Sequence, residues 1–269
     1  MNISRQAYYQ SLQRSAKKKQ LVERVLTFVR QVRTRQPRIG TRKLHYLMHR
    51  GRIDIKMGRD QLFDVLREAI LLVPHKRSYQ KTTYTKHHMT RHPNYLKDGP
   101  DQIIPTSTEQ IWVADITYLP TAASIFAFLS LVTDVYSHKI VGYHIHKTLH
   151  ATSVIEAFKM ALKSRKKKGL LIHHSDRGLQ YCSALYQAMH QKHKILCSMT
   201  DGYDCYQNAL AERVNGILKT EFLIRKPKDF AEAVTMVKEA IYIYNNERPH
   251  TVLEYKTPNE VHQNPSIII

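Results

Sequence analysis

Three acidic residues, each set in its own string of neighbours, are the side chains of this 269-residue chain that could do chemistry together. Asp115 lies within the apolar run WVADITYL, Asp176 ends the run LLIHHSD, and Glu212 lies in NALAERVNGILKTEF. In open α/β sheets, side chains at strand ends face the functional crevice. Carboxylates that converge there from separate elements repel one another unless a cation separates them. The two aspartates are therefore candidates for a shared cation site.

A purely local role is also open for both aspartates. Asp176 precedes Arg-Gly, which suits an Asx-turn, and Asp115 precedes Ile-Thr, which suits the capping of a neighbouring loop. Position alone leaves the two interpretations open.

The glutamate lies in a segment with helical periodicity. One apolar face of this segment combines Leu210, Val214, Ile217 and Leu218. Another face combines Asn208, Glu212, Asn215 and Lys219, so we expect Glu212 and Lys219 to project from one stripe two turns apart. The alternative is a solvent-facing stripe with an incidental salt bridge.

Elements that could position these residues follow from the pattern of apolar residues between positions 109 and 269. Strands are predicted at 110–119, 124–137, 139–146, 170–176 and 194–199, and helices at 151–164 and 183–193, followed by long helices. This order predicts a mixed sheet flanked by helices, an α/β fold.

The first part of the chain has a different texture. Helical periodicity predicts short helices at 20–33, 41–50 and 58–73, closed by Pro37, Gly51 and Pro74. We interpret residues 1–74 as a small all-α, helix-turn-helix-like domain. Residues 75–108 lose periodicity and form a predicted basic, extended linker, and residues 109–269 form the α/β domain with its C-terminal helices.

Charge indicates the partner. Residues 1–108 carry 23 Lys and Arg against 7 Asp and Glu, whereas residues 109–269 carry 19 against 15. A segment this basic neutralises phosphates and releases counterions, so double-stranded DNA is the expected partner. A small helical bundle with a solvated basic surface is the alternative. The basic side chains that we expect to contact DNA in this segment are Arg33, Arg35, Arg38, Arg42 and Lys43.

Composition excludes several other classes of protein. No apolar run is long enough to span a membrane, and the polar N-terminus has no apolar signal region, so we expect no membrane partner and a cytoplasmic location. The three cysteines form no C-x-x-C pair, which favours reduced thiols over a disulfide or a zinc site.

Taken together, the strings are identifiable. WVADITYL, HHSDRGLQYCS and NALAERVNGILKTEF resemble the three acidic motifs of DDE transposases of the insertion sequence 3 family, whose core resembles retroviral integrases. The closing string YNNERPHTVLEYKTP and the N-terminal strings SRQAYYQ and IGTRKLHYLM resemble further parts of the family's second reading-frame product, OrfB. The likeness covers nearly the whole chain.

The resemblance implies a ribonuclease-H-like, integrase-type core in which Asp115, Asp176 and Glu212 form a catalytic, metal-binding triad. Lys219 would correspond to the basic residue expected to touch DNA ends, and we expect Asn208, Asn215 and Arg177 to contact DNA as well. Two Mg²⁺ ions, with Mn²⁺ as a substitute, would suit a triad of hard oxygen ligands.

The implied activity is cleavage at the ends of an insertion sequence followed by strand transfer into target DNA. The implied partners are the terminal inverted repeats, the target DNA, further copies of the chain, and the upstream reading-frame product OrfA, with the nucleoid as the place of action. OrfA matters because no sustained heptad is present here. A catalytically decayed DNA-binding repressor and a ribonuclease-H-fold nuclease without strand transfer are the alternatives.

Overall fold

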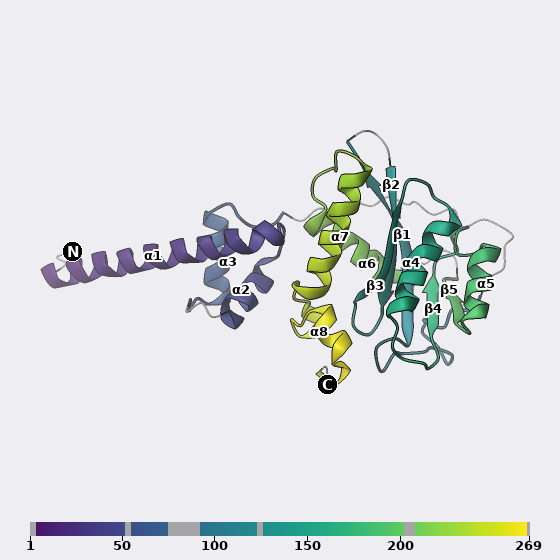
Figure 1. The fold of residues 1–269 in the computed structure, drawn as a ribbon. Coiled ribbons are helices and arrows are strands. Elements are labelled where there is room, and N and C mark those ends of the chain that lie inside the picture. Colours follow the sequence, from purple (N-terminus) through teal and green to yellow (C-terminus); the bar gives the residue numbers. More distant parts are fainter. Residues whose placement is uncertain (1–3, 52–54, 75–91, 123–125, 202–207, 268–269) are drawn as a thin grey trace. The chain divides into compact units, whose positions relative to one another are not determined.

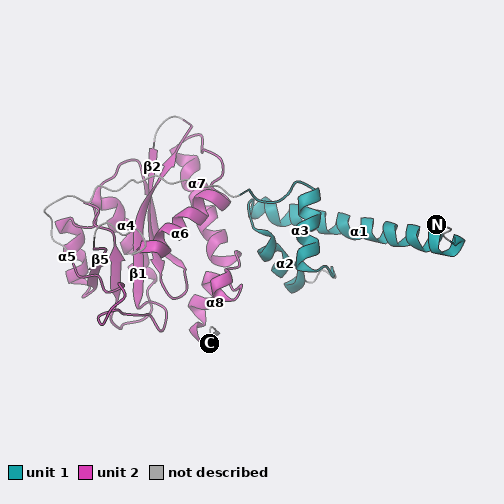
Figure 2. Cartoon of the chain, turned by 180° about the vertical axis from the view of Figure 1, so that it is seen from behind, with its two compact units in different colours: residues 1–76 teal, residues 77–269 magenta. Residues whose placement is uncertain are grey.

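A computed structural model describes residues 4–51, 55–74, 92–122, 126–201 and 208–267 of the chain (Figure 1). The chain divides into two compact units, residues 1–76 and 77–269 (Figure 2). Among the described residues, none of the helices combines the length and the apolar character that crossing a bilayer requires.

The first unit is helical, and its core is built where three helices meet. Its helices are α1 (Arg5–Arg35), α2 (Thr41–Arg50) and α3 (Arg59–Glu68). Val25 and Val29 of α1, Leu44 of α2 and Leu66 of α3 are fully buried in one cluster. The all-α character predicted for this part of the chain is therefore present.

Two helix boundaries differ from the sequence prediction. The helix predicted at 20–33 begins at Arg5, where the Ser4 hydroxyl accepts a hydrogen bond from the Ala7 N–H (3.2 Å). The helix predicted at 58–73 ends at Glu68. The backbone turns at Ile70 with φ at 55°, and the Leu71 N–H donates to the Leu66 carbonyl (2.7 Å), which closes the helix early.

The second unit is built on a five-stranded mixed sheet in the order β3-β2-β1-β4-β5, which confirms the predicted α/β class. The β1–β2 and β2–β3 pairs are antiparallel, and the β1–β4 and β4–β5 pairs are parallel. The strands are β1 (Ile111–Pro120), β2 (Phe126–Asp134), β3 (Ile140–His146), β4 (Ile172–Ser175) and β5 (Leu196–Met199).

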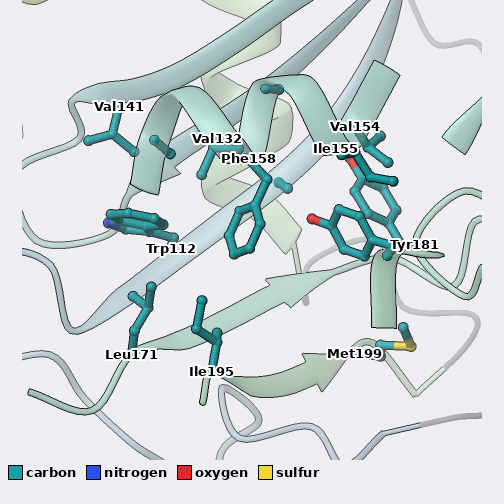
Figure 3. Close-up of a cluster of buried hydrophobic side chains, with 14 of the residues drawn as sticks. Trp112, Val132, Val141, Val154, Ile155, Phe158, Leu171, Tyr181, Ile195 and Met199 are labelled. Atoms are coloured by element: carbon teal, nitrogen blue, oxygen red, sulfur yellow. The ribbon is translucent and has the colours of Figure 1, made fainter. Parts of the chain in front are cut away.

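Helices cover both faces of this sheet. They are α4 (Ala151–Ser164), α5 (Ala184–Lys192), α6 (Ala209–Ile217), α7 (Phe230–Asn246) and α8 (Pro258–Gln263), with single turns η2 (Leu218–Phe222), η3 (Thr251–Leu253) and η4 (Pro265–Ile267). Phe158 of α4 packs edge to face against Trp112 of β1 in one buried cluster (Figure 3). A second cluster joins Leu129 and Leu131 of β2 to Val214 of α6 and Val237 of α7.

One glycine is required for this packing. A Cβ at Gly142 of β3 would lie 2.1 Å from the Ala157 carbonyl oxygen of α4, so any larger residue would push the helix from the sheet.

The linker predicted at 75–108 is described only from residue 92. Residues 75–91 lie outside the described part of the chain, whereas the described residues of the segment hydrogen-bond to edge strand β5. The Met199 N–H donates to the Pro93 carbonyl (3.1 Å), and the Tyr95 N–H donates to the Ser198 hydroxyl (3.0 Å). Residues 92–108 thus belong to the second unit rather than to an extended connector, because β5 offers unpaired edge groups.

Candidate active site

Asp115 and Asp176 stand side by side because of the register between two parallel strands. Ile111 of β1 pairs with Ile172 of β4, and Val113 pairs with His174. Continuing that register by two residues brings Asp115 alongside Asp176, which directly follows β4. Residues in register on parallel strands point to the same face, so both carboxylates face one side of the sheet.

That side of the sheet is the one covered by α6. Asn215 of α6 donates from Nδ2 to Oδ2 of Asp115 (2.7 Å). The opposite side of β1 carries Trp112 and Ala114 into the cluster beneath α4. Successive side chains of β1 point to opposite faces of the sheet, so the Asp115 carboxylate lies away from the cluster beneath α4.

The Asp115 carboxyl lies in an environment that opposes its charge. Burial, followed by the nearby Asp176 carboxylate, raises the pKa of Asp115 to about 7, although the Asn215 hydrogen bond acts in the other direction. Glu212 contributes a further, smaller rise in the same pKa. A carboxyl with this pKa is the group whose charge an added cation would stabilise most.

Glu212 lies on α6, the helix that contacts β1, and its side chain is exposed. Partial burial and the Asp176 carboxylate raise the pKa of Glu212. The three acids predicted from separate strings therefore share one electrostatic environment. In the described part of the chain, no three His, Cys, Asp or Glu side chains lie close enough to hold one ion together.

Asp176 also makes the local turn that its neighbours suggested. Its Oδ1 accepts the Gly178 N–H (3.0 Å), and a Cβ at Gly178 would lie 3.0 Å from the same oxygen. The turn fixes the carboxylate at the end of β4 and leaves its second oxygen outside this hydrogen bond. The Asx-turn and a site role are thus compatible.

Asn208 and Asn215 differ from the sequence expectation of DNA contact. Both are buried, and both point at β1: Asn208 donates from Nδ2 to the Ala114 carbonyl (3.0 Å), and Asn215 bonds Asp115. Their Oδ1 atoms are covered by protein and have no hydrogen-bond partner among the described residues. These two amides fix α6 to the strand that carries Asp115, so they position the site rather than face DNA.

Lys219 follows α6 in the π-helical turn η2, exposed at the surface. Partial burial lowers the pKa of Lys219, and the negative charge of Asp115 acts against that decrease. The ammonium group is therefore within electrostatic reach of Asp115, but the predicted stripe is not one face, because Asn208 and Asn215 are buried whereas Glu212 and Lys219 are exposed. Arg177, directly after Asp176, is half-exposed.

A buried ion pair that the sequence patterns did not predict lies beneath this turn. Arg248 donates from Nε and Nη2 to the two oxygens of Glu221 (2.8 and 2.6 Å), and Arg248 is only 4% exposed. Glu221 lies in η2, two residues after Lys219, so the pair joins the end of α7 to the turn that carries the lysine. The string NERPH within the closing motif is the signal that could have pointed to Arg248.

The basic side chains of the first unit that we expected to contact DNA differ in their exposure to solvent. Arg35 and Arg42 are exposed, and Arg38 and Lys43 are half-exposed. Arg33 is different: its Nε and Nη2 atoms are covered by protein, and burial lowers its pKa. Arg33 therefore has less of its guanidinium available to a phosphate than the exposed Arg35 and Arg42 have.

Comparisons with known proteins agree with this geometry. An integrase core domain model matches residues 105–205, and a second integrase core domain model matches residues 193–258. A protein of Shigella sonnei, described as an uncharacterized 31 kDa protein of insertion element IS600, is 34% identical over 261 residues, 95% of this chain and 93% of that protein.

Two further similarities extend the comparison. The transposase InsF for insertion sequence IS3A of Escherichia coli K12 is 33% identical over 156 residues, 58% of this chain and about half (53%) of its own length. Among solved structures, the simian T-cell lymphotropic virus intasome in complex with PP2A regulatory subunit B56 gamma aligns with a TM-score of 0.52 and 20% identity. That alignment covers 84% of this chain and 75% of the intasome chain.

The intasome likeness supports the fold alone, whereas the relatives in sequence carry the family. The first of them matches nearly the full length of both chains, and the sheet order with its acidic residues is what the three strings predicted. The chain belongs to the insertion sequence 3 family of DDE transposases, with a catalytic core of the retroviral-integrase type.

Proposed function

We propose that this transposase cleaves the ends of an insertion sequence and joins the freed strands to target DNA with Asp115, Asp176 and Glu212 as its catalytic, metal-binding residues. The observation that supports this most directly is the β1–β4 register, which aligns Asp115 with Asp176 on the face covered by the glutamate's helix. Carboxylates that serve only as caps need no such alignment.

Divalent metal ions fit the donor set. All three side chains are carboxylates, the hard oxygen ligands that Mg²⁺ prefers, and burial makes the charge of Asp115 costly until a cation neutralises it. We infer two Mg²⁺ ions, with Mn²⁺ as a substitute, and expect Glu212 to move toward the aspartates when they bind. Such ions generate a nucleophile near neutral pH and stabilise charge on the attacking and leaving oxygens.

Two displacements at phosphorus make up the proposed reaction. In the first, a water oxygen bonds to phosphorus at the element's end, the bond to the 3′ oxygen breaks, and that oxygen leaves as a 3′-hydroxyl. In the second, the 3′-hydroxyl oxygen bonds to a target phosphorus, loses its proton, and displaces the target's own 3′ oxygen. Positioning and electrostatic stabilisation dominate such phosphoryl chemistry.

The other residues of the site hold and orient these groups. Asn215 orients Asp115, and Asn208 fixes the start of α6 against β1. Lys219 and Arg177 would contact the phosphates of the bound end, and Arg35, Arg38, Arg42 and Lys43 would contact flanking duplex. We infer that the terminal inverted repeats and target DNA are the substrates and that several copies act together on DNA. The upstream product OrfA would join them, at the nucleoid.

Incubation with DNA under defined metal conditions tests the proposal. A labelled duplex carrying the element's own terminal repeat is mixed with a supercoiled target plasmid in Mg²⁺, Mn²⁺ or EDTA, with and without OrfA. We expect metal-dependent nicked and joined products, both lost in Glu212→Gln. Glu239→Gln, an exposed glutamate of α7, is the matched control and should retain both products.

Each alternative function gives a different result. Nicks without joined products would favour a nuclease. Binding without any product in Mg²⁺ or Mn²⁺, with OrfA present, would favour a repressor. Full activity of Glu212→Gln would remove the glutamate from the triad.

A further inference from the structure

The first half of α1 is exposed to solvent along its length in the part of the chain that the structure describes. Every residue from Ser4 to Gln20 is exposed, and the first buried residue of the helix is Val25. The helix extends beyond α2 and α3 in both views of the first unit (Figures 1 and 2). Sixteen residues of α-helix span about 24 Å, long enough to follow a macromolecular surface.

A helix of this kind needs a partner. Isolated helices of about 15 residues are marginal in water because nucleation is costly and no packed face repays it. The contacts within residues 5–20 are local: the Arg5 guanidinium lies over the Tyr9 ring at 6.0 Å, and Tyr8 meets Tyr9 edge to face. Tyr8 is 56% exposed and Leu12 is 49% exposed.

The charge of this segment indicates an anionic partner. Residues 5–20 contain five basic side chains and no acidic one. Arg14, Lys17, Lys18 and Lys19 have no acidic partner among the described residues. Basic side chains interleaved with tyrosines are typical of surfaces that bind nucleic acid.

Charge differs sharply between the three helices of the unit. The whole of α1 carries nine Lys and Arg and one Glu, and α2 carries three basic side chains and no acidic one. In contrast, α3 carries two Arg against Asp60, Asp64 and Glu68. These three acids are exposed and spaced i, i+4 and i+8, so they form one acidic stripe.

The acidic stripe argues against α3 as the helix that enters a DNA groove. In a helix-turn-helix unit, the second helix lies in the major groove, and a turn of three or four residues joins it to the first. Here residues 51–58 separate α2 from α3, and the acidic stripe of α3 would face phosphates. Two of its acids pair with Arg59 and Arg67 of the same helix, which leaves little positive charge for DNA.

A second protein helix is a weaker fit to the first half of α1. The apolar stripe that begins with Tyr8 and Leu12 continues with Ser15 and Lys19, which interrupt a coiled-coil seam. We propose that residues 5–20 form a helix that binds duplex DNA through its backbone phosphates, and that α1 rather than α3 is the principal DNA-binding helix of the first unit. This inference rests on the proposed function, since it assigns the duplex contact to a particular helix.

Salt-dependent DNA binding tests the inference in the full chain. The affinity for a labelled duplex of unrelated sequence is measured by fluorescence anisotropy over a series of NaCl concentrations. The test variant is K17Q/K18Q/K19Q. The matched control, K192Q/K194Q/K238Q, removes the same charge from exposed positions of the second unit. Circular dichroism verifies that the helix content of both variants equals that of the wild type.

We expect the test variant to bind at least tenfold more weakly at low salt. Its plot of log affinity against log salt should be less steep by about 2–3, since each lost phosphate contact removes about 0.9 from the slope. The control should stay within twofold of the wild type. An unchanged affinity and slope in K17Q/K18Q/K19Q would overturn the inference.

Two further variants separate the remaining outcomes. D60N/D64N should strengthen binding only slightly, and a gain of affinity in this variant as large as the loss expected in the lysine variant would assign DNA to α3 instead. If Y8A/L12A lowers the oligomeric state while the lysine variant binds normally, the helix is a protein interface. Because metal-dependent cleavage is measured separately, its survival in K17Q/K18Q/K19Q with normal binding would refute this inference and leave the proposed function standing.

Discussion

Asp115 shows how much a single buried carboxyl can cost a fold in stability. Its carboxyl lies in a strand, near a second carboxylate, with a pKa raised to about 7. An unfolded chain would hold this group near its ordinary value. Above that value, the folded chain therefore loses stability as the pH rises toward 7, because only the unfolded chain ionises the group freely.

Replacing this carboxyl should therefore stabilise the metal-free protein. We expect Asp115→Asn to raise the unfolding free energy by about 1–2 kcal/mol near pH 8, or Tm by about 2–8 °C. The Asn oxygen can still accept the Asn215 hydrogen bond. Thermal unfolding in EDTA measures the gain, with Asp101→Asn, an exposed aspartate, as the control. A lower Tm in the Asp115 variant would contradict the account, and added Mg²⁺ should stabilise the wild type more than the variant.

His190 has the opposite effect on how folding stability depends on pH. Its ring stacks on Phe158 (4.7 Å between centroids), its Nδ1–H donates to the Tyr186 carbonyl (2.8 Å), and burial lowers its pKa to about 4. The folded chain keeps this ring neutral, whereas an unfolded chain protonates it near pH 6.5. The resulting stability is complete above pH 6.5 and is lost as the pH falls toward 4.

Removing this titration should flatten the acid sensitivity. Between about pH 7.5 and pH 5, we expect the unfolding free energy of His190→Phe to fall by about 2 kcal/mol less than that of the wild type. Urea unfolding at the two pH values provides the measurement. Equal losses in the two proteins would mean that His190 does not titrate in the unfolding transition.

At the scale of elements, the C-terminal string YNNERPH holds the helical layer to the sheet and to the site. Asn245 bonds both the N–H and the carbonyl of Ile140 in β3 (3.0 and 2.9 Å), and Tyr244 donates to the His138 carbonyl (3.1 Å). Arg248 then fixes η2 through Glu221. A motif without a catalytic group thus sets the position of the turn that carries Lys219.

The Arg248–Glu221 pair should show strong coupling. We expect Glu221→Gln to lower the free energy of unfolding by about 3 kcal/mol, because it leaves the buried Arg248 cation without its carboxylate partner. Arg248→Met should lower it less, because the Glu221 side chain is 20% exposed. The double variant should lose less than the sum of the two. A double-mutant cycle by urea unfolding measures this coupling, and the exposed pair Lys159–Glu156 provides a reference of about 0–1 kcal/mol. Additive losses at Arg248 and Glu221 would contradict the role given to the pair.

Much of the element order followed from apolar patterning, and the exceptions have physical causes. The strand around Asp115 was predictable because the residues beside it are apolar, and the structure buries most of them. The first half of α1 was not, because residues 5–20 are exposed and their apolar stripe is interrupted by Ser15 and Lys19. The roles of Asn208 and Asn215 depend on contacts with residues about 100 positions away, and no local pattern encodes such a register.

Across the whole molecule, the second unit depends on a segment that precedes its first strand. Residues 92–108 cover edge strand β5 through Pro93 and Tyr95. We expect a chain of residues 92–269 to unfold cooperatively. A chain of residues 109–269 should lose at least about 2 kcal/mol, or about 4–8 °C in Tm, since two hydrogen bonds to β5 disappear together with the His92–Gln187 hydrogen bond and the exposed Lys97–Asp201 ion pair. Thermal unfolding of both fragments measures the difference.

A comparison at one position sharpens this prediction. Ser198→Ala in residues 92–269 removes the acceptor for the Tyr95 N–H and also the partner of the buried His174 Nδ1 (2.8 Å), so its cost in unfolding free energy includes both hydrogen bonds. Equal stability of the two fragments would show that the segment only rests against β5. A more aggregation-prone shorter fragment would agree with an uncovered sheet edge.

The uneven distribution of charge within residues 1–76 also governs how this unit meets a polyanion. With positive charge concentrated along α1 and a negative stripe on α3, the unit has a dipole as well as a net charge. In the field of a duplex, a dipole experiences a torque before any contact forms. If α1 binds DNA as proposed, we expect encounters to begin with α1 leading, which would shorten the search for a correct orientation.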